Sequence, residues 1–383
     1  MNLEAFDSEA FLRDYWQRKP LLIRNPWTQW HNPLEPDELA GLACEAEVEA
    51  RLVVAKGGKR KVEHGPFADS RFAKLGKSPW TLLVQAVDHL VPDVAALIAP
   101  FRFIPDWRID DVMVSYASDG GGVGPHFDQY DVFLIQGLGR RRWRIGAPVS
   151  SATELAPHAD LRLLANFEAT EEWVLEPGDI LYVPPGIPHD GEAVGDDCMT
   201  YSVGFRAPAR SELVSHWCDD LIVDLDEDDR YADPGLAVQT NPGEISAEAL
   251  GALHAMVTQT LGDRDAFAHW FGRYNTAPKN PEIDWRPEEP VDADEIRELI
   301  AAGTPLIRNP ASRFAFAERE DQSLWLFVDG EAFACEGMTA IFARDLCVSD
   351  ALKPDPAQAA SEPVLDLLAT LFNQGSVGFD CED

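Results

Sequence analysis

The stretch from residue 110 to residue 206 constrains the fold of this chain most strongly. Short runs of β-branched and aromatic residues are separated there by Gly, Pro and Asp turns: DVMVSYAS, DVFLIQG, RRWRIG, EEWVLEPGD, ILYVPP and CMTYSVGF. An alternation with period two is typical of strands whose two faces differ. About six to eight short strands joined by tight turns predict a barrel or a double-sheet jelly roll.

The sequence on either side of this stretch is expected to be mainly helical. Before it, apolar residues recur at helical spacing over 37–47 and 79–98, with strand-like pieces at 20–24 and 51–54. After it, the same spacing predicts helices at 211–223, 247–260 and 266–274. A Pro-rich linker follows at 275–290.

The last part of the chain predicts a small α+β module. A helix is expected at 292–302, strands at 314–317 and 325–328 with a turn at Asp329-Gly330, and a helix–strand pair at 363–379. We therefore expect an α+β protein in three parts: a β-rich domain at 1–208, a helical region at 209–280 and a C-terminal domain at 281–383.

The charge of the chain is strongly negative and unevenly distributed. There are 32 Lys and Arg residues against 66 Asp and Glu residues, a formal net charge of −34, and residues 211–383 hold 11 basic and 35 acidic residues of these. Such an excess opposes binding to bare nucleic acid and favours a basic partner. A salt-tolerant or merely soluble surface would show the same excess, and charge alone does not separate the two interpretations.

Neither a membrane segment nor a secretion signal is expected. No stretch approaches the roughly 18 consecutive apolar residues of a membrane helix, and the first residues, MNLEAFDSEAF, are acidic. The six cysteines are scattered without a CxxC pair, which favours a reducing compartment over a disulfide or zinc framework. We therefore expect a soluble, cytoplasmic protein.

Two separate motifs predict a metal site. His126 and Asp128 follow a Gly-rich turn and, two apart on a strand, leave the same face. His189 ends the run EPGDILYVPPGIPH, which places a PGD turn, a strand and a Pro-rich turn before it. An HxD pair alone is common by chance, but the paired context favours a metal. Two imidazoles and one carboxylate leave adjacent positions open, which suits Fe(II) binding a 2-oxoacid and dioxygen.

One arginine is expected to face inward beside these motifs. On the strand RRRWRI, one face carries three arginines and is solvent-like, whereas the other carries Arg141, Trp143 and Ile145. A buried arginine needs an anionic partner, and a bidentate carboxylate such as the distal end of 2-oxoglutarate fits best. The alternative is that Arg141 pairs with an internal acid.

Further residues on neighbouring strands predict a pocket wall. Asp111, Met113 and Ser115 share one face, and Tyr130 shares the face of the metal motif. An acid, a methionine and a ring would hold a long cationic side chain, and Ser115 would donate to a cosubstrate carboxylate. On the late strand, Thr200 or Ser202 would add a hydroxyl. The alternative is an edge strand with exposed acids.

The residues just described make the chain similar to JmjC-type 2-oxoglutarate oxygenases. It most closely resembles the bacterial ribosomal oxygenases of the cupin-4 family, over essentially the whole chain. The most specific part is GGVGPHFDQYDVFLIQGLGRRRW at 121–143, and the others are YWQRKP at 15–20, EPGDILYVPPGIPH at 176–189 and YSVGFRAP at 201–208.

This resemblance implies a fold and a set of site residues. The fold is a double-stranded β-helix (cupin/JmjC jelly roll) with helical N-terminal elements, a helical dimerisation region and a winged-helix-like C-terminal module. The implied cofactor is Fe(II), with 2-oxoglutarate and O2 as co-substrates. The metal and catalytic positions are His126, Asp128 and His189, the 2-oxoglutarate position is Arg141, and the substrate positions are Asp111, Met113, Tyr130 and Ser202.

The resemblance also implies an activity and partners. The activity is hydroxylation of an arginine side chain on a basic ribosomal protein, the large-subunit (50S) protein L-sixteen, with release of succinate and CO2. A homodimer is implied by the helical region. A winged helix often binds DNA, but this one lies in the more acidic half of the chain, so no direct nucleic-acid binding is expected.

Other functions remain open at this point. Hydroxylation of histidine on a ribosomal protein and demethylation of lysine use the same iron chemistry on other substrates. A non-redox metal cupin would have no need of an inward Arg141. A non-catalytic scaffold would be expected to have lost a member of the metal triad, and the three residues are all present.

Overall fold

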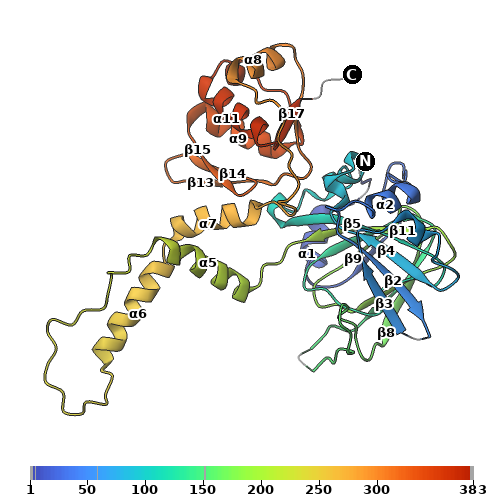
Figure 1. Cartoon of the computed structure of the whole chain (residues 1–383), viewed down its shortest axis with the longest axis horizontal. Coiled ribbons are helices and arrows are strands. Elements are labelled where there is room, and N and C mark those ends of the chain that lie inside the picture. The colour runs from blue at the N-terminus through green and yellow to red at the C-terminus, as the bar shows by residue number, and fades with distance from the viewer. Residues whose placement is uncertain (1–2, 5, 58, 151, 380–383) are drawn as a thin grey trace.

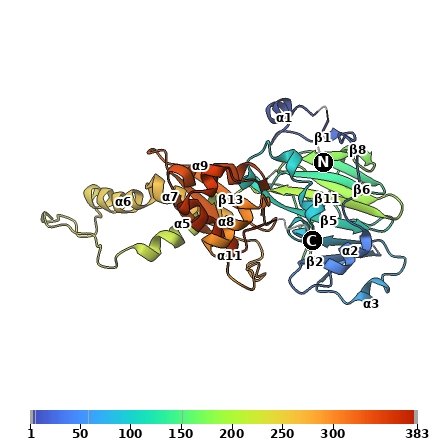
Figure 2. The same ribbon diagram turned by 90° about the horizontal axis from the view of Figure 1, so that it is seen from above.

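The structure is a computed structural model that describes residues 3–4, 6–57, 59–150 and 152–379. Three regions follow one another along the chain (Figure 1): a β-rich body formed by residues up to 206, a helical arm at 209–276, and a C-terminal lobe at 291–379. Seen from above, the lobe lies between the body and the far end of the arm (Figure 2). None of the described helices is long and apolar enough to cross a membrane.

The body consists of two antiparallel sheets, as a jelly roll requires. The larger sheet has the strand order β1-β9-β6-β11-β5-β4-β2-β3 and the smaller sheet the order β10-β7-β8. The strands are β1 (Leu21–Ile23), β2 (Ala50–Lys56), β3 (Lys59–His64), β4 (Trp80–Val84), β5 (Ile109–Ala117), β6 (Val132–Leu138), β7 (Arg141–Gly146), β8 (Ala169–Leu175), β9 (Ile180–Val183), β10 (His189–Ala193) and β11 (Cys198–Phe205). The double-sheet fold predicted for this part of the chain is confirmed.

The two faces of the larger sheet have different roles. Its outer face packs against the N-terminal helices through a core that includes Phe11, Phe101 and Phe133. Its inner face packs against the smaller sheet through a second cluster that includes Leu134, Trp143 and Leu181. Alternation along each strand thus sends polar residues of the inner face into the space between the sheets.

The helices around the body are short. They are α1 (Ser8–Asp14), α2 (Pro36–Leu42), α3 (Asp69–Phe72) and α4 (Pro92–Ala95), with single turns η1 (Val87–His89), η2 (Ala99–Phe101) and η3 (Asp106–Arg108). The prediction of a helix over 79–98 is wrong, because β4 occupies its first part between β5 and β2. Four of the five residues of β4 are buried. In such a continuous apolar run the spacing of apolar residues does not distinguish a strand from a helix.

The helical arm contains the three helices predicted from the sequence. They are α5 (Arg210–Asp224), α6 (Ala247–Leu261) and α7 (Arg264–Thr276). Helix α7 packs against α5 and against the strands of the lobe, whereas none of the residues of α6 is buried. Leu250, Leu253 and Val257 lie on one face of α6 and expose about half of their surface, with 55%, 42% and 59% accessible.

The lobe folds around its own apolar core. Its helices are α8 (Ala293–Ala301), α9 (Gly337–Val348), α10 (Pro356–Ala359) and α11 (Glu362–Asn373), and its strands are β12 (Leu306–Arg308), β13 (Phe314–Glu318), β14 (Leu324–Val328), β15 (Glu331–Cys335), β16 (Ala351–Leu352) and β17 (Val377–Phe379). The predicted hairpin turn is confirmed: Asp329 and Gly330 both have positive φ, 51° and 86°, as a primed turn requires.

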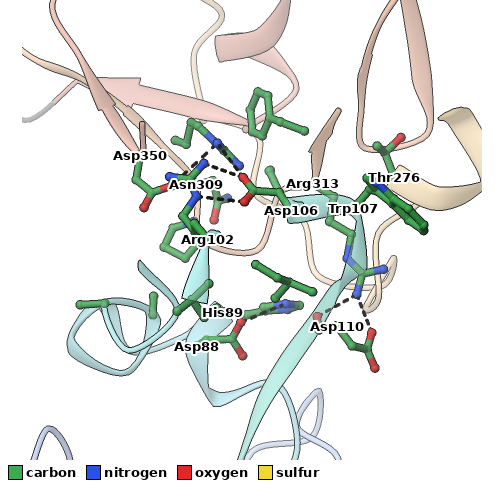
Figure 3. Close-up of a pocket in the computed structure, with 18 of the residues that line it drawn as sticks. Asp88, His89, Arg102, Asp106, Trp107, Asp110, Thr276, Asn309, Arg313 and Asp350 are labelled. Carbon is green, nitrogen blue, oxygen red and sulfur yellow. Dashed lines mark hydrogen bonds and ion pairs between the residues drawn. The ribbon is translucent and has the colours of Figure 1, made fainter. Parts of the chain in front are cut away.

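Charged side chains join the lobe to the body. Arg102 bonds both carboxylate oxygens of Asp106 and reaches Asp350 of the lobe, and Arg313 of the lobe donates to Asp110 of the body at 3.0 Å. Figure 3 shows these contacts around a cavity of about 300 Å³ between the two regions. The body and the lobe are therefore fixed to each other beside the start of β5.

Candidate active site

Backbone hydrogen bonds hold the three predicted metal ligands together. The amides of His126 and His189 each donate to the carbonyl of the other, at 3.0 and 2.8 Å. The amide of Gly186, in the Pro-rich turn, donates to the carbonyl of Asp128 at 2.7 Å. The two motifs therefore meet through the main chain, independently of any metal.

The local conformation around His126 differs from the expectation. Residues 125–130 do not form a continuous strand, and His126 makes only an isolated bridge to His189, while β6 begins at Val132. Pro125 lacks an N–H group and Gly124 has a φ of 104°, so the chain turns here instead of pairing along its length. The predicted strand is therefore wrong, although His126 and Asp128 still approach the same point.

The side chains of the triad form a compact donor set. One ligand atom from each of His126, Asp128 and His189 lies within 4.8 Å of the others. Nδ1 of His126 lies 2.8 Å from the carbonyl of Gly124, and Nδ1 of His189 lies 3.0 Å from the carbonyl of Ile187. Because a carbonyl only accepts, each Nδ1 carries the proton and each Nε2 keeps its lone pair for a metal.

Burial sets the protonation state of the inner histidine. His189 is buried, and this burial together with the neighbouring His126 lowers the pKa of His189 to about 4. The ring is therefore neutral near neutral pH, which is the form that binds a metal. Two imidazoles and one carboxylate with adjacent open positions fit Fe(II).

The triad lies at the wall of a cavity of about 590 Å³ between the two sheets. All nine site residues predicted from the sequence line this cavity: Asp111, Met113, Ser115, His126, Asp128, Tyr130, Arg141, His189 and Ser202. The face assignments on β5, β7 and β11 thus bring the predicted residues together. Their individual roles remain predictions.

Arg141 brings an unpaired cation into this cavity. Only 4% of its surface is exposed, and its Nε and Nη2 groups find no acceptor among the described residues. The internal acid that the alternative interpretation requires is therefore not found in the described part of the chain. A buried guanidinium with free N–H groups on one edge fits a bidentate carboxylate ligand.

The hydroxyl groups that line the cavity together with Arg141 differ in their hydrogen bonds. Ser115 is buried and its Oγ lies 3.4 Å from the carbonyl of Thr200, a long bond that a carboxylate ligand can replace. Thr200 also lines the cavity and donates to Oε1 of Gln136 at 3.2 Å. Ser202 lies opposite Met113 across β11 and β5.

The proposed substrate end of the cavity is acidic and aromatic. Asp111 is 5% exposed on a strand that lies between β11 and β4, so the alternative of an exposed edge strand is wrong. Burial raises the pKa of Asp111. Tyr130 is 43% exposed, and burial beside Asp128 raises the pKa of its hydroxyl, which therefore stays protonated.

The sequence reasoning missed several charged residues of this cavity, and Lys279 is the one that forms an ion pair with Asp111. Lys279 lines it and its Nζ lies 2.9 Å from Oδ2 of Asp111. Lys279 lies in the Pro-rich linker between the arm and the lobe, far from Asp111 in sequence. No local pattern distinguishes a single linker lysine, and only the close packing of the linker on β5 brings it to the site.

Family models match several parts of the chain. The model of the JmjC domain matches residues 96–213, and that of the ROXA-like winged helix matches residues 258–378. A model of the AraC-like ligand binding domain matches residues 168–260. The JmjC match contains the complete triad and Arg141.

Comparison with individual proteins gives the family. The chain is 44% identical over 299 residues to the ribosomal protein uL16 3-hydroxylase of Escherichia coli, which covers 78% of this chain and 79% of that protein. The crystal structure of E. coli ycfD superposes with a TM-score of 0.91 at 37% identity, over 99% of this chain and 100% of that one. A structure of the ribosomal oxygenase YcfD with cobalt and 2-oxoglutarate superposes with a TM-score of 0.88 at 37% identity, over 99% of both chains. The chain therefore belongs to the ribosomal oxygenases, a family of JmjC-domain enzymes that use a metal and 2-oxoglutarate.

Proposed function

We propose that this protein is an Fe(II)- and 2-oxoglutarate-dependent oxygenase that hydroxylates an arginine of ribosomal protein uL16, the large-subunit protein L-sixteen. The observation that carries this proposal is the buried, unpaired Arg141 in the same cavity as the compact triad. A non-redox metal cupin has no use for such a cation. The target protein is inferred from the E. coli relative, which is a uL16 3-hydroxylase.

The triad and Arg141 divide the binding of metal and cosubstrate. Nε2 of His126, Nε2 of His189 and the Asp128 carboxylate would hold Fe(II), and the Arg141 guanidinium would hold the distal carboxylate of 2-oxoglutarate. When bound, the metal and 2-oxoglutarate together supply the activation of O2, in which 2-oxoglutarate leaves as succinate and CO2 and one oxygen atom enters the substrate. Ser115 and Thr200 offer hydroxyl groups to the cosubstrate.

The residues at the other end of the cavity would hold the substrate arginine. The Asp111 carboxylate would accept from the guanidinium, while Met113 and Tyr130 would pack along its methylene groups. Ser202 adds a polar contact at the same wall. These side chains take no part in bond making or breaking. They contribute by holding the substrate carbon in a fixed orientation, which a freely moving side chain would not have.

The proposal is tested with purified protein, Fe(II), 2-oxoglutarate and recombinant uL16. We expect one succinate for each hydroxylated arginine, with the hydroxyl located by peptide fragmentation. Hydroxylated histidine would identify the alternative activity on a ribosomal protein, and loss of methyl groups from lysine would identify a demethylase. Absence of 2-oxoglutarate turnover would contradict the proposal.

We also propose that the arm makes the protein a homodimer. The apolar stripe of α6 is formed by Leu250, Leu253, Val257 and Leu261. It remains exposed among the residues that the structure describes, and it has the spacing of a helix–helix contact. A second copy would cover it. The chain would then consist of an oxygenase domain at 1–208, a dimerisation region at 209–280 and a winged-helix-like domain at 281–383, acting in the cytoplasm without binding nucleic acid directly.

A further inference from the structure

Lys279 reaches the proposed substrate end of the cavity from the linker. Its Nζ lies 2.9 Å from Oδ2 of Asp111 and 3.1 Å from Oδ2 of Asp110. It is one of only two lysines in residues 211–383, the other being Lys353. A lysine side chain that is three-quarters buried, with 24% accessible, is unusual because its ammonium loses hydration, and two carboxylates offset this loss here.

The linker around Lys279 is fastened to the body. The side-chain amide of Asn275 donates to the carbonyl of Trp107 at 3.2 Å, and the guanidinium of Arg206 donates to the carbonyl of Asn275. Arg313 of the lobe donates to the carbonyl of Ala277 at 3.3 Å. These bonds place the main chain just before Lys279 beside β5, so its side chain enters the cavity from a fixed base.

The hydrogen bonds of Asp111 are distributed unequally between its two oxygens. Oδ2 accepts from the backbone amide of Ala86 at 2.8 Å in addition to Lys279. With its amide nitrogen turned toward Asp111, Gln85 donates to the same Oδ2 at 3.2 Å and its oxygen accepts from Arg51. Oδ1 has no donor among the described residues, and it lies beside Gly204, which also lines the cavity and carries no side chain to block it.

The charge of Asp111 depends on this lysine. Burial raises the pKa of Asp111, the nearby Asp110 raises it further, and Lys279 opposes both. Burial works against the charge of Lys279 as well, but Asp111 and Asp110 together hold its pKa above the ordinary value. Arg206 and Arg313 also form ion pairs with Asp110. The other ionisable groups near the Asp111–Lys279 pair are Asp88 and His89 of η1, Arg51 of β2, and Tyr130.

We propose that Lys279 is a positioning residue for the substrate: it holds Oδ2 of Asp111 and keeps this carboxylate ionised, so that Oδ1 is left to accept from the substrate guanidinium. This proposal rests on the function proposed above. It also assigns a role to the C-terminal part of the chain, because the linker and Arg313 of the lobe fix the residue that completes the substrate pocket of the oxygenase domain.

The proposal is tested by the kinetics of Lys279→Met, with Lys279→Arg as the conservative variant and Lys353→Met as the control for loss of an exposed lysine. In Lys279→Met we expect KM for recombinant uL16 at pH 7 to rise about tenfold or more, because loss of the ammonium removes the charge that opposes the burial-raised pKa of Asp111, and part of the carboxyl is then protonated. The rise should shrink toward pH 9, because Asp111 then ionises without help. Lys279→Arg should restore most of the loss, and Lys353→Met should behave as the unchanged protein.

Three results would overturn the proposal. An unchanged KM in Lys279→Met would show that Asp111 needs no partner. A lower KM would show that Lys279 competes with the substrate instead of supporting it. A KM that is raised in Lys279→Met to the same extent at every pH would show that the contact of Lys279 with Asp111 is only structural. 2-Oxoglutarate turnover without uL16 should be the same in Lys353→Met as in the unchanged protein.

A second measurement does not depend on the substrate. The pKa of the Asp111 carboxyl, followed by carbon NMR, should be higher in Lys279→Met than in the unchanged protein and in Lys279→Arg. An equal pKa would overturn the proposal about Lys279 even if uL16 proves not to be the substrate. Conversely, a failure of the unchanged protein to hydroxylate uL16 would count against the proposed function and not against the role of Lys279.

Discussion

The guanidinium carbon of Arg141 lies 5.7 Å from the centre of the Trp143 ring, and neither side chain satisfies its buried N–H groups among the described residues. The ring makes a cation–π contact with one face of the guanidinium, but it accepts no hydrogen bond from the N–H groups in the guanidinium plane. A buried cation in this state destabilises the ligand-free protein, and an anionic ligand removes that cost. We therefore propose that Arg141 contributes to ligand binding at the expense of stability.

Replacement of Arg141 by Met should separate these two effects. We expect KM for 2-oxoglutarate to rise about 100-fold, since loss of one partner of a buried charge pair costs on the order of 2–5 kcal/mol. The free energy of unfolding of the ligand-free protein should rise at the same time, by about 1 kcal/mol or more. Steady-state kinetics and chemical denaturation measure the two quantities. Arg140→Met, on the exposed side of the same segment, is the control, and a destabilised Arg141→Met would contradict this account.

Removal of the metal should leave the fold intact. The ligand-bearing segments are joined by the mutual backbone bonds of His126 and His189, which persist without an ion. Asp128→Ala should therefore fold normally and bind little Fe(II) by metal analysis. Its 2-oxoglutarate turnover should fall more than about 100-fold, because loss of a residue that only hydrogen-bonds to a metal ligand already costs 10- to 100-fold. Asp160→Ala, another acid of the cavity, should keep its metal. An unfolded metal-free protein would contradict the prediction.

Asp111 should matter for the protein substrate and not for the cosubstrate. Asp111→Ala removes the proposed guanidinium acceptor, and we expect kcat/KM for uL16 to fall about 100-fold, as for other buried charge-assisted bonds. KM for 2-oxoglutarate should stay the same. Asp93→Ala, an exposed acid on α4, serves as the control. Full activity of Asp111→Ala would exclude the guanidinium anchor and favour histidine as the target.

Asp88 should make the stability of the protein depend on pH. Burial, with Asp111 adding, raises the pKa of Asp88 to about 8 from its ordinary value near 4. Between these values the folded protein binds a proton that the unfolded chain has lost, so this group lowers stability as the pH rises. Asp88→Asn keeps an oxygen for the amide of Val112, which donates to Oδ1 of Asp88 at 2.8 Å.

We therefore expect Asp88→Asn to have a larger free energy of unfolding than the unchanged protein at pH 8. At pH 5 this difference should be clearly smaller. The difference should change by up to about 1.4 kcal/mol per pH unit. Urea denaturation at the two pH values measures it. A difference that does not change with pH would show that Asp88 is ionised in the folded protein.

The exposed stripe of α6 should control the oligomeric state. Leu253→Glu places a charge in the middle of this stripe, and a buried unpaired charge is costly enough to dissociate a helix-mediated dimer. Light scattering should give the mass of two chains for the unchanged protein and of one chain for Leu253→Glu. Leu155→Glu, at an equally exposed leucine of the body with 40% accessible, should not change the mass. A monomeric unchanged protein would contradict the proposal.

The sequence was sufficient to predict the parts of the site that depend on alternation along a strand. Asp111, Met113 and Ser115 on β5 and Arg141 on β7 line the cavity because their strands are paired on both sides, which fixes the direction of every second side chain. The segment around His126 departs from strand geometry, since its conformation is set by hydrogen bonds to the distant His189 and Gly186. Local pattern contains no information on such partners.

Long-range contacts explain the remaining differences. The helix predicted over 79–98 is replaced by β4 because pairing with β2 and β5 satisfies its backbone and buries both of its faces. The edge strand β3, with sequence KRKVEH, went unrecognised because charged residues, which protect sheet edges, also resemble a loop. Lys279 could not be found because its partner Asp111 lies in another region of the fold.

The most direct test of the proposed function is mass spectrometry of uL16 isolated from the host with and without the gene for this protein. We predict one arginine of uL16 that is heavier by one oxygen atom only when the gene is present and the triad is intact. An Asp128→Ala copy of the gene should behave as the deletion does. A uL16 that carries the same modifications in all three strains would contradict the assignment of uL16 as the substrate.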